Sequence, residues 1–487
     1  QYDHAAVAGL VFRQGLALYL MRHDGQAATT DDFVQAMAEV SNRDLSQFKK
    51  WYTQAGTPRL RVQSMYDAQA QTYTLTLGQS TPPTPGQPEK KPLHIPLALA
   101  LLDTEGKEIT LSCPERQAEA ERGLFELRET EEIIRFDTVA EQPRLSLLRN
   151  FSAPIKVDYA CDTKELLFLF RHDQDPFNRW EAGQCLASRL LLGLMEDFRN
   201  DRPLLLDERF VAACGRLLEG DGGKDTAFIA LLLTLPSEEY LAEQMDIVDV
   251  EAIHAARTFA RQTLTRSLRS LWEHAYQANR TDGPYRYEPH LAGQRALRNL
   301  CLAYLASLED AAAIQMAIAQ FRGANNMTDQ MAAFAVLAHS ARPERQQIIA
   351  DFYQQWQGDS LVLDKWFAVQ ATAPLPETLV EVQTLMAHPA FQLKNPNKVR
   401  ALIGSFAAGN PLCFHEASGR GYQFLADQIL ALDPLNPQIA ARLAARLGRG
   451  ARYDGNRRAL MQAQLERIAA SPTLSRDVYE VVSKSLG

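Results

Sequence analysis

The spacing of apolar residues changes twice along the chain, and each change marks a different kind of secondary structure. Through about residues 1–55 apolar residues recur at helical spacing, in short pieces. Phe33–Val40 carries such a stripe behind a helix-capping signal at Thr30–Phe33. A second helix is predicted over Leu45–Gln54, where the following Gly and Pro would end it. The opening of the chain is therefore predicted to be helical.

Between residues 58 and 154 the spacing of apolar residues shortens to two, which is typical of half-buried β-strands. Turn clusters rich in Pro, Gly and Asp interrupt the alternation at 81–86 and 103–106. The alternating runs are Tyr73–Leu77, Leu93–Leu101, Glu108–Leu111 and Glu132–Phe136. Several short strands at this spacing predict a small antiparallel β-sandwich.

From Asp158 to Gly487 helical spacing returns, and prolines cut it into segments of ordinary helix length. The predicted helices are Phe177–Leu194, Ala227–Leu235, Glu251–Ala275, Ala292–Leu308, Met327–Ser340 and Leu361–Ala371. Many helices joined by short loops predict stacked helix pairs, an α-solenoid. Because no repeat of about 34 or 40 residues recurs, we expect irregular, HEAT-like stacking with a concave face.

Composition and charge exclude several classes of protein. The 487 residues, 46% hydrophobic and 23% charged, suit a globular protein of about three domains and exclude a disordered chain or a fibre. The net charge of −8 argues against a polyanion-binding surface. No stretch approaches the ~20 apolar residues of a membrane span, and the first residues lack the features of a signal peptide. Six scattered cysteines without a C-x-x-C pair indicate a reducing compartment, so a cytoplasmic location is predicted.

The motifs of well-known catalytic sites do not occur. The zincin pattern H-E-x-x-H is absent, as are G-x-S-x-G, the P-loop and G-x-G-x-x-G. Cys413, His415 and Glu416 offer three types of metal ligand, but residues this close in sequence fan out and cannot close a tetrahedron alone. His172–Asp175 is instead predicted to be a polar turn that caps the next helix. A Cys–His pair formed across the fold stays open, because sequence does not reveal it.

The distribution of charge is more informative than its sum. Residues 395–460, called here the basic segment, hold nine bases and four acids, which gives +5 and leaves −13 for the remainder. The bases are Lys398, Arg400, Arg420, Arg442, Arg446, Arg449, Arg452, Arg457 and Arg458. Two interpretations stay open: a solvated helix face with snorkelling arginines, or an electropositive wall that attracts carboxylates such as peptide C-termini. Nucleic acid is disfavoured, because Tyr422 and Tyr453 are the only obvious ring platforms nearby.

A series of short segments carries a resemblance to a known family. They are Arg22–Gly25, Asp31–Met37, Trp51–Pro58, Phe151–Pro154, Asn326–Asp329, Leu361–Phe367, Asn395–Phe406 and Asn436–Leu443. The first three look like the end of the catalytic domain, and the others like the C-terminal domain, of the bacterial aminopeptidase N family. The similarity runs in the same order from about Phe12 to the C-terminus.

This resemblance implies both an activity and a fold. The family consists of zinc exopeptidases that remove N-terminal residues from peptides. This chain resembles their C-terminal portion, after the zinc ligands and the general-base Glu, so alone it is expected to be inactive and to hold no cofactor, with zinc in the parent enzyme. The implied fold is multidomain and mainly α: the helical tail of a thermolysin-like domain (1–57), a β-sandwich (58–155) and an irregular α-solenoid (156–487).

The resemblance also implies roles for particular residues. Arg400 and Arg442 look like family arginines at the opening of the α domain towards the active site, and together with Lys398 they are predicted to guide peptides. Tyr2 weakly resembles the family's transition-state tyrosine, and the alternative is that it only marks the edge of this chain. The implied partners are peptide substrates and the missing N-terminal and catalytic domains of the same enzyme, with neither nucleic acid nor a membrane.

A second hypothesis is that this chain is not part of an enzyme. It would be a stand-alone α-solenoid that binds peptides or protein partners on its concave face. The first 55 residues discriminate between the two hypotheses, because the apolar stripe of Phe33–Val40 needs a domain body to pack against. In an independent scaffold these helices should fray.

Overall fold

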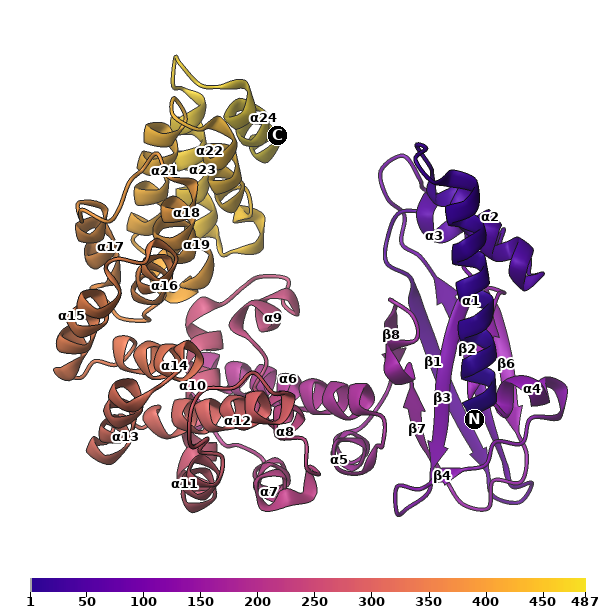
Figure 1. Ribbon diagram of the computed structural model, residues 1–487. Coiled ribbons are helices and arrows are strands. Elements are labelled where there is room, and N and C mark those ends of the chain that lie inside the picture. Colours follow the sequence, from indigo (N-terminus) through magenta and orange to yellow (C-terminus); the bar gives the residue numbers. More distant parts are fainter. Residues whose placement is uncertain (1) are drawn as a thin grey trace. The chain divides into compact units, whose positions relative to one another are not determined.

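The computed structural model describes the backbone of residues 2–487, and their side chains except those of residues 2–8 and 221 (Figure 1). The chain forms two compact units, Gln1–Leu186 and Ala187–Gly487, called here unit 1 and unit 2. Unit 1 holds the β-structure and unit 2 is helical. The finer boundaries expected from the sequence, 1–57, 58–155 and 156–487, stay predictions.

Unit 1 begins with two helices that pack against each other, α1 (Tyr2–His23) and α2 (Thr30–Ser41). A capping box starts α2: Thr29 Oγ1 accepts a hydrogen bond from Asp32 N at 3.3 Å, and Asp32 Oδ2 accepts one from Thr29 N at 2.8 Å. The N-cap therefore lies one residue before the predicted signal. In α2 only Val34 and Ala36 are buried, while the apolar stripe is half-buried and Phe33 meets Tyr19 of α1 with ring centroids 5.3 Å apart.

The predicted helix Leu45–Gln54 is wrong in length, because the structure has only a short helix there, α3 (Lys50–Thr53). Asp44 Oδ1 accepts a hydrogen bond from Ser46 N at 2.8 Å, which favours a turn over an earlier helix start. Gln47 Nε2 donates to the Arg128 carbonyl at 2.7 Å and so ties this turn to the sandwich that follows.

Two sheets of four strands each form the sandwich. The strands are β1 (Arg59–Asp67), β2 (Thr72–Ser80), β3 (Ile95–Leu102), β4 (Glu108–Ile109), β5 (Leu124–Leu127), β6 (Glu131–Phe136), β7 (Arg144–Leu147) and β8 (Lys156–Tyr159), with a short helix α4 (Gln117–Ala120) between β4 and β5. One sheet has the order β6-β2-β1-β8; the other has the order β4-β3-β5, with β7 also paired to β3. Within the described residues β1 and β8 are parallel and the other strand pairs antiparallel, so the predicted antiparallel sandwich is confirmed with one parallel pair.

The sandwich core holds large apolar side chains, among which Phe125 and Phe136 meet edge to face with ring centroids 5.7 Å apart. The alternating runs in the sequence correspond to β2, β3, β4 and β6. Strand β1 was not predicted from the alternation of apolar residues. Only Leu60 and Val62 alternate with exposed neighbours, and the rest of the strand is largely exposed. A strand with so little burial carries a weak apolar signal.

Two helices follow the sandwich, α5 (Thr163–His172) and α6 (Pro176–Arg199). The turn between them caps α6, since Asp175 Oδ1 accepts a hydrogen bond from Asn178 N at 2.9 Å. Asp173 Oδ1 accepts one from Asp175 N at 2.9 Å and holds the turn in place. The predicted polar turn is confirmed.

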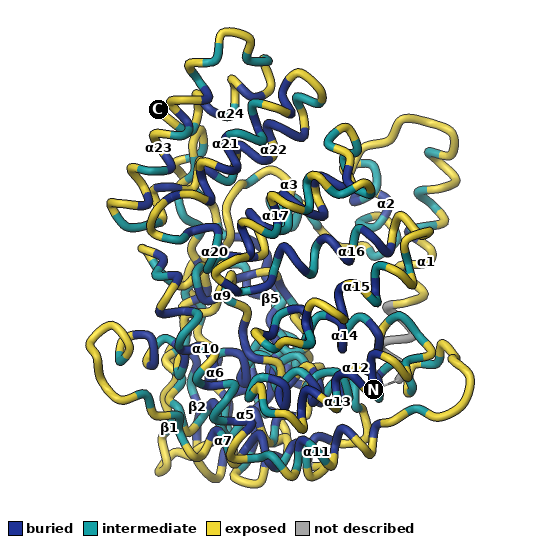
Figure 2. Tube along the Cα trace, turned by 90° about the vertical axis from the view of Figure 1, so that its left-hand side faces the viewer, coloured by how far each residue is buried: buried dark blue, intermediate teal, exposed yellow. Residues whose placement is uncertain are grey.

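The helices of unit 2 mostly pack against their neighbours in chain order. They are α7 (Glu208–Arg216), η3 (Leu217–Asp221), α8 (Thr226–Leu233), α9 (Glu238–Glu243), α10 (Val250–Ser267), α11 (Arg269–Ala278), α12 (Pro289–Ala306), α13 (Ala311–Gly323), α14 (Met327–Ala338), α15 (Glu344–Trp356), α16 (Ser360–Ala371), α17 (Thr378–Met386), α18 (Pro396–Val399), η4 (Arg400–Gly404), α19 (Ser405–Gly409), α20 (Pro411–Phe414), α21 (Arg420–Leu432), α22 (Pro437–Leu447), η5 (Gly450–Arg452), α23 (Gly455–Ala469) and α24 (Arg476–Leu486). Figure 2 shows buried residues on many of these helices, such as α14 and α16. The predicted α-solenoid is confirmed.

In unit 2 the predicted helix Glu251–Ala275 is wrong: it is divided into α10 and α11 at Leu268, whose φ of −118° and ψ of 22° leave the helical region. Past this break the indole of Trp272 is fully buried, donates from Nε1 to the Leu264 carbonyl at 3.2 Å and stacks on Tyr304 at 4.2 Å. The break coincides with tertiary packing that the helical spacing does not reveal. No described helix is both long and apolar enough to span a membrane.

Candidate functional site

Lys398, a predicted substrate-access residue, lies inside the helical stack of unit 2. Only 4% of its surface is exposed. Its ammonium group donates to the Ser360 carbonyl at 2.7 Å and forms an ion pair with Asp364 Oδ1 at 2.8 Å, both on α16. Lys398 therefore joins α18 to α16, and its predicted contact with peptides stays a prediction.

Arg400 and Arg442, the other two predicted access residues, are exposed. Arg400 opens η4 and donates from Nη1 to Asn397 Oδ1 at 2.9 Å. Arg442 projects from α22 between two buried neighbours, so its guanidinium group faces solvent. The remaining candidate, Tyr2, begins α1 but its side chain lies outside the described residues, and its role also stays a prediction.

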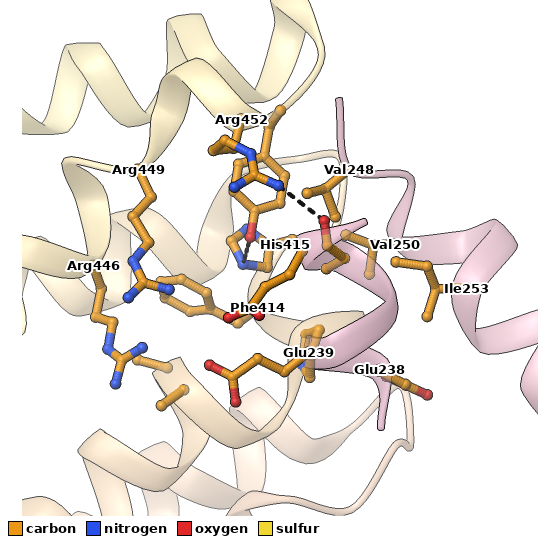
Figure 3. A pocket seen from close by; sticks show the side chains of 16 residues that line it. Glu238, Glu239, Val248, Val250, Ile253, Phe414, His415, Arg446, Arg449 and Arg452 are labelled. Atoms are coloured by element: carbon orange, nitrogen blue, oxygen red, sulfur yellow. Dashed lines mark hydrogen bonds between the residues drawn. The ribbon is translucent and has the colours of Figure 1, made fainter. Parts of the chain in front are cut away.

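Three further arginines of the basic segment line a pocket of about 330 Å³ in unit 2 (Figure 3). One wall is formed by α9 and the start of α10, and the other by α19, α20, α22 and η5. The lining residues are Glu238, Glu239, Ala242, Glu243, Val248, Val250, Ile253, Ala407, Ala408, Pro411, Phe414, His415, Arg446, Arg449, Arg452 and Tyr453. This space, called here the α9–η5 pocket, brings together residues about two hundred positions apart in sequence.

Charges of opposite sign face each other across the α9–η5 pocket. Glu239 and Glu243 belong to α9, whereas Arg446 and Arg449 come from the end of α22 and the residues after it. Figure 3 shows the carboxylate of Glu239 and the guanidinium groups of both arginines extending into the same space. Five apolar residues of the lining are almost fully buried, namely Val248, Val250, Ile253, Ala407 and Phe414.

Arg452 holds the two walls of the pocket together. Its Nη2 donates to the carbonyls of Ala242 at 2.9 Å and Met245 at 2.7 Å, and its own carbonyl accepts from Val248 N at 2.7 Å. These bonds join η5 to the connection between α9 and α10. Arg452 is therefore engaged by the fold, unlike the two arginines beside it.

His415, one of the lining residues, lies between two tyrosines. Its Nδ1 lies 2.9 Å from Tyr422 Oη and its Nε2 lies 2.9 Å from Tyr453 Oη, and the ring stacks on Tyr453 at 4.2 Å. Burial, assisted by the charge of Arg457, lowers the pKa of His415 to about 3. The imidazole is therefore neutral at physiological pH, with both ring nitrogens engaged by phenols.

Arg457 connects this cluster to the neighbouring helices. It donates from Nε to the His415 carbonyl at 2.6 Å, pairs through Nη1 with Asp454 at 2.8 Å, and pairs through Nη2 with Glu251 of α10. Only 8% of the residue is exposed. The guanidinium group thus joins α23 to α10 and keeps the ring cluster in place.

Cys413, His415 and Glu416, the three possible metal ligands of the sequence, each have hydrogen-bond partners within the fold. Cys413 Sγ lies 3.2 Å from the Leu375 carbonyl, whereas both ring nitrogens of His415 lie within hydrogen-bond distance of tyrosine hydroxyls. In the part of the chain that is described, no group of three or more His, Cys, Asp and Glu side chains could hold a metal ion. No disulfide joins any of the six cysteines, all of which lie in the described part of the chain. Burial raises the pKa of the Cys214 and Cys301 thiols to about 12, so these thiols stay protonated at neutral pH.

Comparison with known proteins gives a consistent result along nearly the whole chain. Residues 163–487 match a family described as a domain of unknown function (DUF3458_C) with ARM repeats, and residues 56–160 match a domain of unknown function (DUF3458) with an Ig-like fold. Aminopeptidase N of Escherichia coli (strain K12) is 41% identical over 475 residues, which are 98% of this chain and 54% of that protein. Aminopeptidase N of Caulobacter vibrioides is 42% identical over 483 residues, which are 99% of this chain and 54% of that protein.

A solved structure gives the same result. The crystal structure of Legionella pneumophila aminopeptidase A in complex with aspartic acid matches with a TM-score of 0.83 at 31% identity. The match covers 98% of this chain and 55% of the other. This chain therefore spans about half the length of the curated relatives it matches.

Proposed function

We propose that this chain, which belongs to the aminopeptidase N family, serves as the C-terminal part of a zinc metalloaminopeptidase that removes N-terminal residues from peptides. The observation that carries this proposal is the 41% identity to an aminopeptidase N over 98% of the chain. In this proposal the chain caps the active site and controls the access of peptides. Zinc is held by catalytic domains of the same enzyme, in the cytoplasm.

Exposed apolar residues on α1 support a partnership with such domains. Leu10, Phe12, Leu20 and Met21 are each more than half exposed, with Met21 at 76%. Large apolar side chains this exposed on one helix are consistent with a surface in contact with another protein body. Because the relatives are almost twice as long as the part matched here, we assign that surface to the catalytic domains of the same enzyme.

The exposed guanidinium groups of Arg400 and Arg442 are proposed to guide substrates. A peptide carries a C-terminal carboxylate, and a guanidinium group binds a carboxylate through charge-assisted hydrogen bonds. Lys398 supports this surface indirectly, since its ion pair with Asp364 holds α18 just before Arg400.

The guidance role is tested in the full-length enzyme that contains this chain. The double variant Arg400→Ala/Arg442→Ala is expected to raise KM for peptides several-fold while changing KM for aminoacyl anilides little, because anilides carry no C-terminal carboxylate. The matched control is Arg458→Ala/Arg476→Ala, which removes the same charge from other exposed positions. Equal effects on both substrates, or an equal effect of the control, would contradict the guidance role.

The assignment to a longer enzyme is tested by an immunoblot of the source cells with an antibody raised against this chain. A band clearly heavier than 54.5 kDa that carries zinc-dependent aminopeptidase activity is expected. A single band at 54.5 kDa would overturn the assignment and favour the stand-alone scaffold.

A further inference from the structure

We propose that the α9–η5 pocket is a binding site for the α-carboxylate of a small amino acid or peptide with an apolar side chain, and that Arg446, Arg449 and Tyr453 recognise that carboxylate. This inference goes beyond the proposed function, because it assigns the chain a ligand site of its own. It rests on residues of unit 2 alone.

The first support is the state of the two arginines. Among the described residues Arg446 and Arg449 have neither an ion pair nor a side-chain hydrogen bond, whereas the neighbouring Arg452 is engaged by two backbone carbonyls. Two guanidinium groups that extend into one pocket without a partner offer paired N–H donors, which match the geometry of a carboxylate.

The second support is a donor supplied by Tyr453. A neutral imidazole has one N–H and one acceptor nitrogen, so of the two tyrosines on His415 one donates and the other accepts. Tyr422 is fully buried, and within the described residues His415 Nδ1 is the only hydrogen-bond partner of its hydroxyl. The Tyr422 hydroxyl must therefore donate to Nδ1, because a buried O–H without an acceptor is strongly disfavoured.

This assignment determines the direction of the second bond. With Nδ1 accepting, the His415 proton sits on Nε2 and is donated to Tyr453 Oη. The Tyr453 hydroxyl then still has its own proton to give. Tyr453 lines the pocket, and the charges of Arg449 and Arg446 act on it, so this proton is available to an anion that the two arginines attract.

The third support is the rest of the lining. Val250, Ile253 and Phe414 supply an apolar surface, and Glu239 lies opposite the arginines. An amino acid with an apolar side chain has the matching three parts: a carboxylate, an apolar body and an ammonium group. A cavity of about 330 Å³ is at the lower end of the sizes typical of small-ligand sites, ~300–1,000 Å³.

The test is isothermal titration of the intact 487-residue chain with four probes. Leucine carries both charges, N-acetylleucine carries only the carboxylate, leucinamide carries only the ammonium group, and Gly-Gly-Leu presents the carboxylate at the end of a peptide. Leucine is expected to bind at least tenfold more tightly than leucinamide. If N-acetylleucine and Gly-Gly-Leu bind as tightly as leucine does, the natural ligand is a peptide C-terminus. If both bind more weakly than leucine, the natural ligand is the free amino acid.

Three variants connect the binding to the named residues. Arg446→Gln/Arg449→Gln is expected to weaken leucine binding at least tenfold while its thermal unfolding midpoint stays unchanged. Tyr453→Phe is expected to weaken leucine binding several-fold. The control Arg458→Gln/Arg476→Gln removes the same charge from exposed positions that do not line the pocket and is expected to change affinity less than twofold. Equal binding of leucinamide, an equal loss in the control, or no binding of any probe at 10 mM would overturn the proposal. Because the readout is binding to this chain, its failure is distinct from a failure of the proposed enzymatic role.

Discussion

Two stretches of the basic segment, α18–η4 and α22–η5, place their cations in contrasting environments. In α18–η4 the ammonium group of Lys398 is buried and paired with Asp364. In α22–η5 Arg442 is exposed, while Arg446 and Arg449 project toward solvent and the pocket. The same formal charge therefore stabilises the fold at Lys398, whereas at Arg446 and Arg449 it has no partner among the described residues.

The phase of each residue on its helix explains the difference. Lys398 is adjacent to Val399 and four residues before Leu402, on the buried side of its helix. In α22 the buried positions are occupied by apolar residues, namely Ile439, Ala440, Ala441, Leu443, Ala444 and Leu447, and Arg442 and Arg446 fall between them. A basic side chain on the buried side of a helix requires an acidic partner, because an unpaired buried charge is costly, whereas one on the exposed side is solvated by water.

The largest effect is expected at Lys398. Lys398→Met leaves the Asp364 carboxylate unpaired and should lower the free energy of unfolding by about 3 kcal/mol, the lower end of what breaking a buried ion pair costs. The lower end applies because the Asp364 side chain is 21% exposed. Urea denaturation of the variant and of Lys394→Met, an exposed neighbour, measures it. Equal changes in both variants would remove the contrast between buried and exposed bases.

A smaller effect is expected from the pH dependence of His415, which lies between the two stretches. Its pKa falls from 6.5 to about 3 on folding, so between these values the unfolded chain binds a proton that the folded chain does not. The stability is complete above pH 6.5 and is lost progressively as the pH falls toward 3. At pH 5 the loss from this group is about 2 kcal/mol.

This loss is isolated by comparison with a variant. From pH 7 to pH 5 the free energy of unfolding of His415→Gln should fall by about 2 kcal/mol less than that of the natural chain. Burial also lowers the pKa of His339 and His388, but these residues are present in both proteins and cancel in the difference. Identical pH dependence in the two proteins would mean that His415 is not held neutral.

The smallest effect is expected at Arg442. Arg442→Ala removes an exposed guanidinium group and should change the free energy of unfolding by less than ~0.5 kcal/mol. The measurement is the same urea denaturation. A loss approaching that of Lys398→Met would show that Arg442 is engaged by the fold and is not free to guide peptides.

Local patterns predicted much of the fold. The alternation in Tyr73–Leu77 identified β2, and helical spacing identified α12, α14 and α16 within a few residues. Where the prediction was wrong, a tertiary or side-chain contact is found at that place. Packing of Trp272 accompanies the break between α10 and α11, and turn bonds around Asp44 shorten α3.

The site was less accessible to such reasoning. The count of charges identified the basic segment, but it did not separate the buried Lys398 from the free Arg446. Glu239 carried no signal at all, because nothing in its own neighbourhood distinguishes it from other surface acids. Tyr453 and His415 are 38 positions apart, so their hydrogen bond leaves no trace in any local pattern.

The amino-acid sequence by itself determined the class of each region, the order of the β-sandwich and the α-solenoid, and the family to which the chain belongs. These depend on spacing over two to four residues and on segments that persist among relatives. Only the tertiary structure decided which arginines are free, which tautomer His415 adopts and where a pocket forms. Those properties depend on contacts such as Arg452 with Ala242, 210 residues away, which arise only when distant helices pack together.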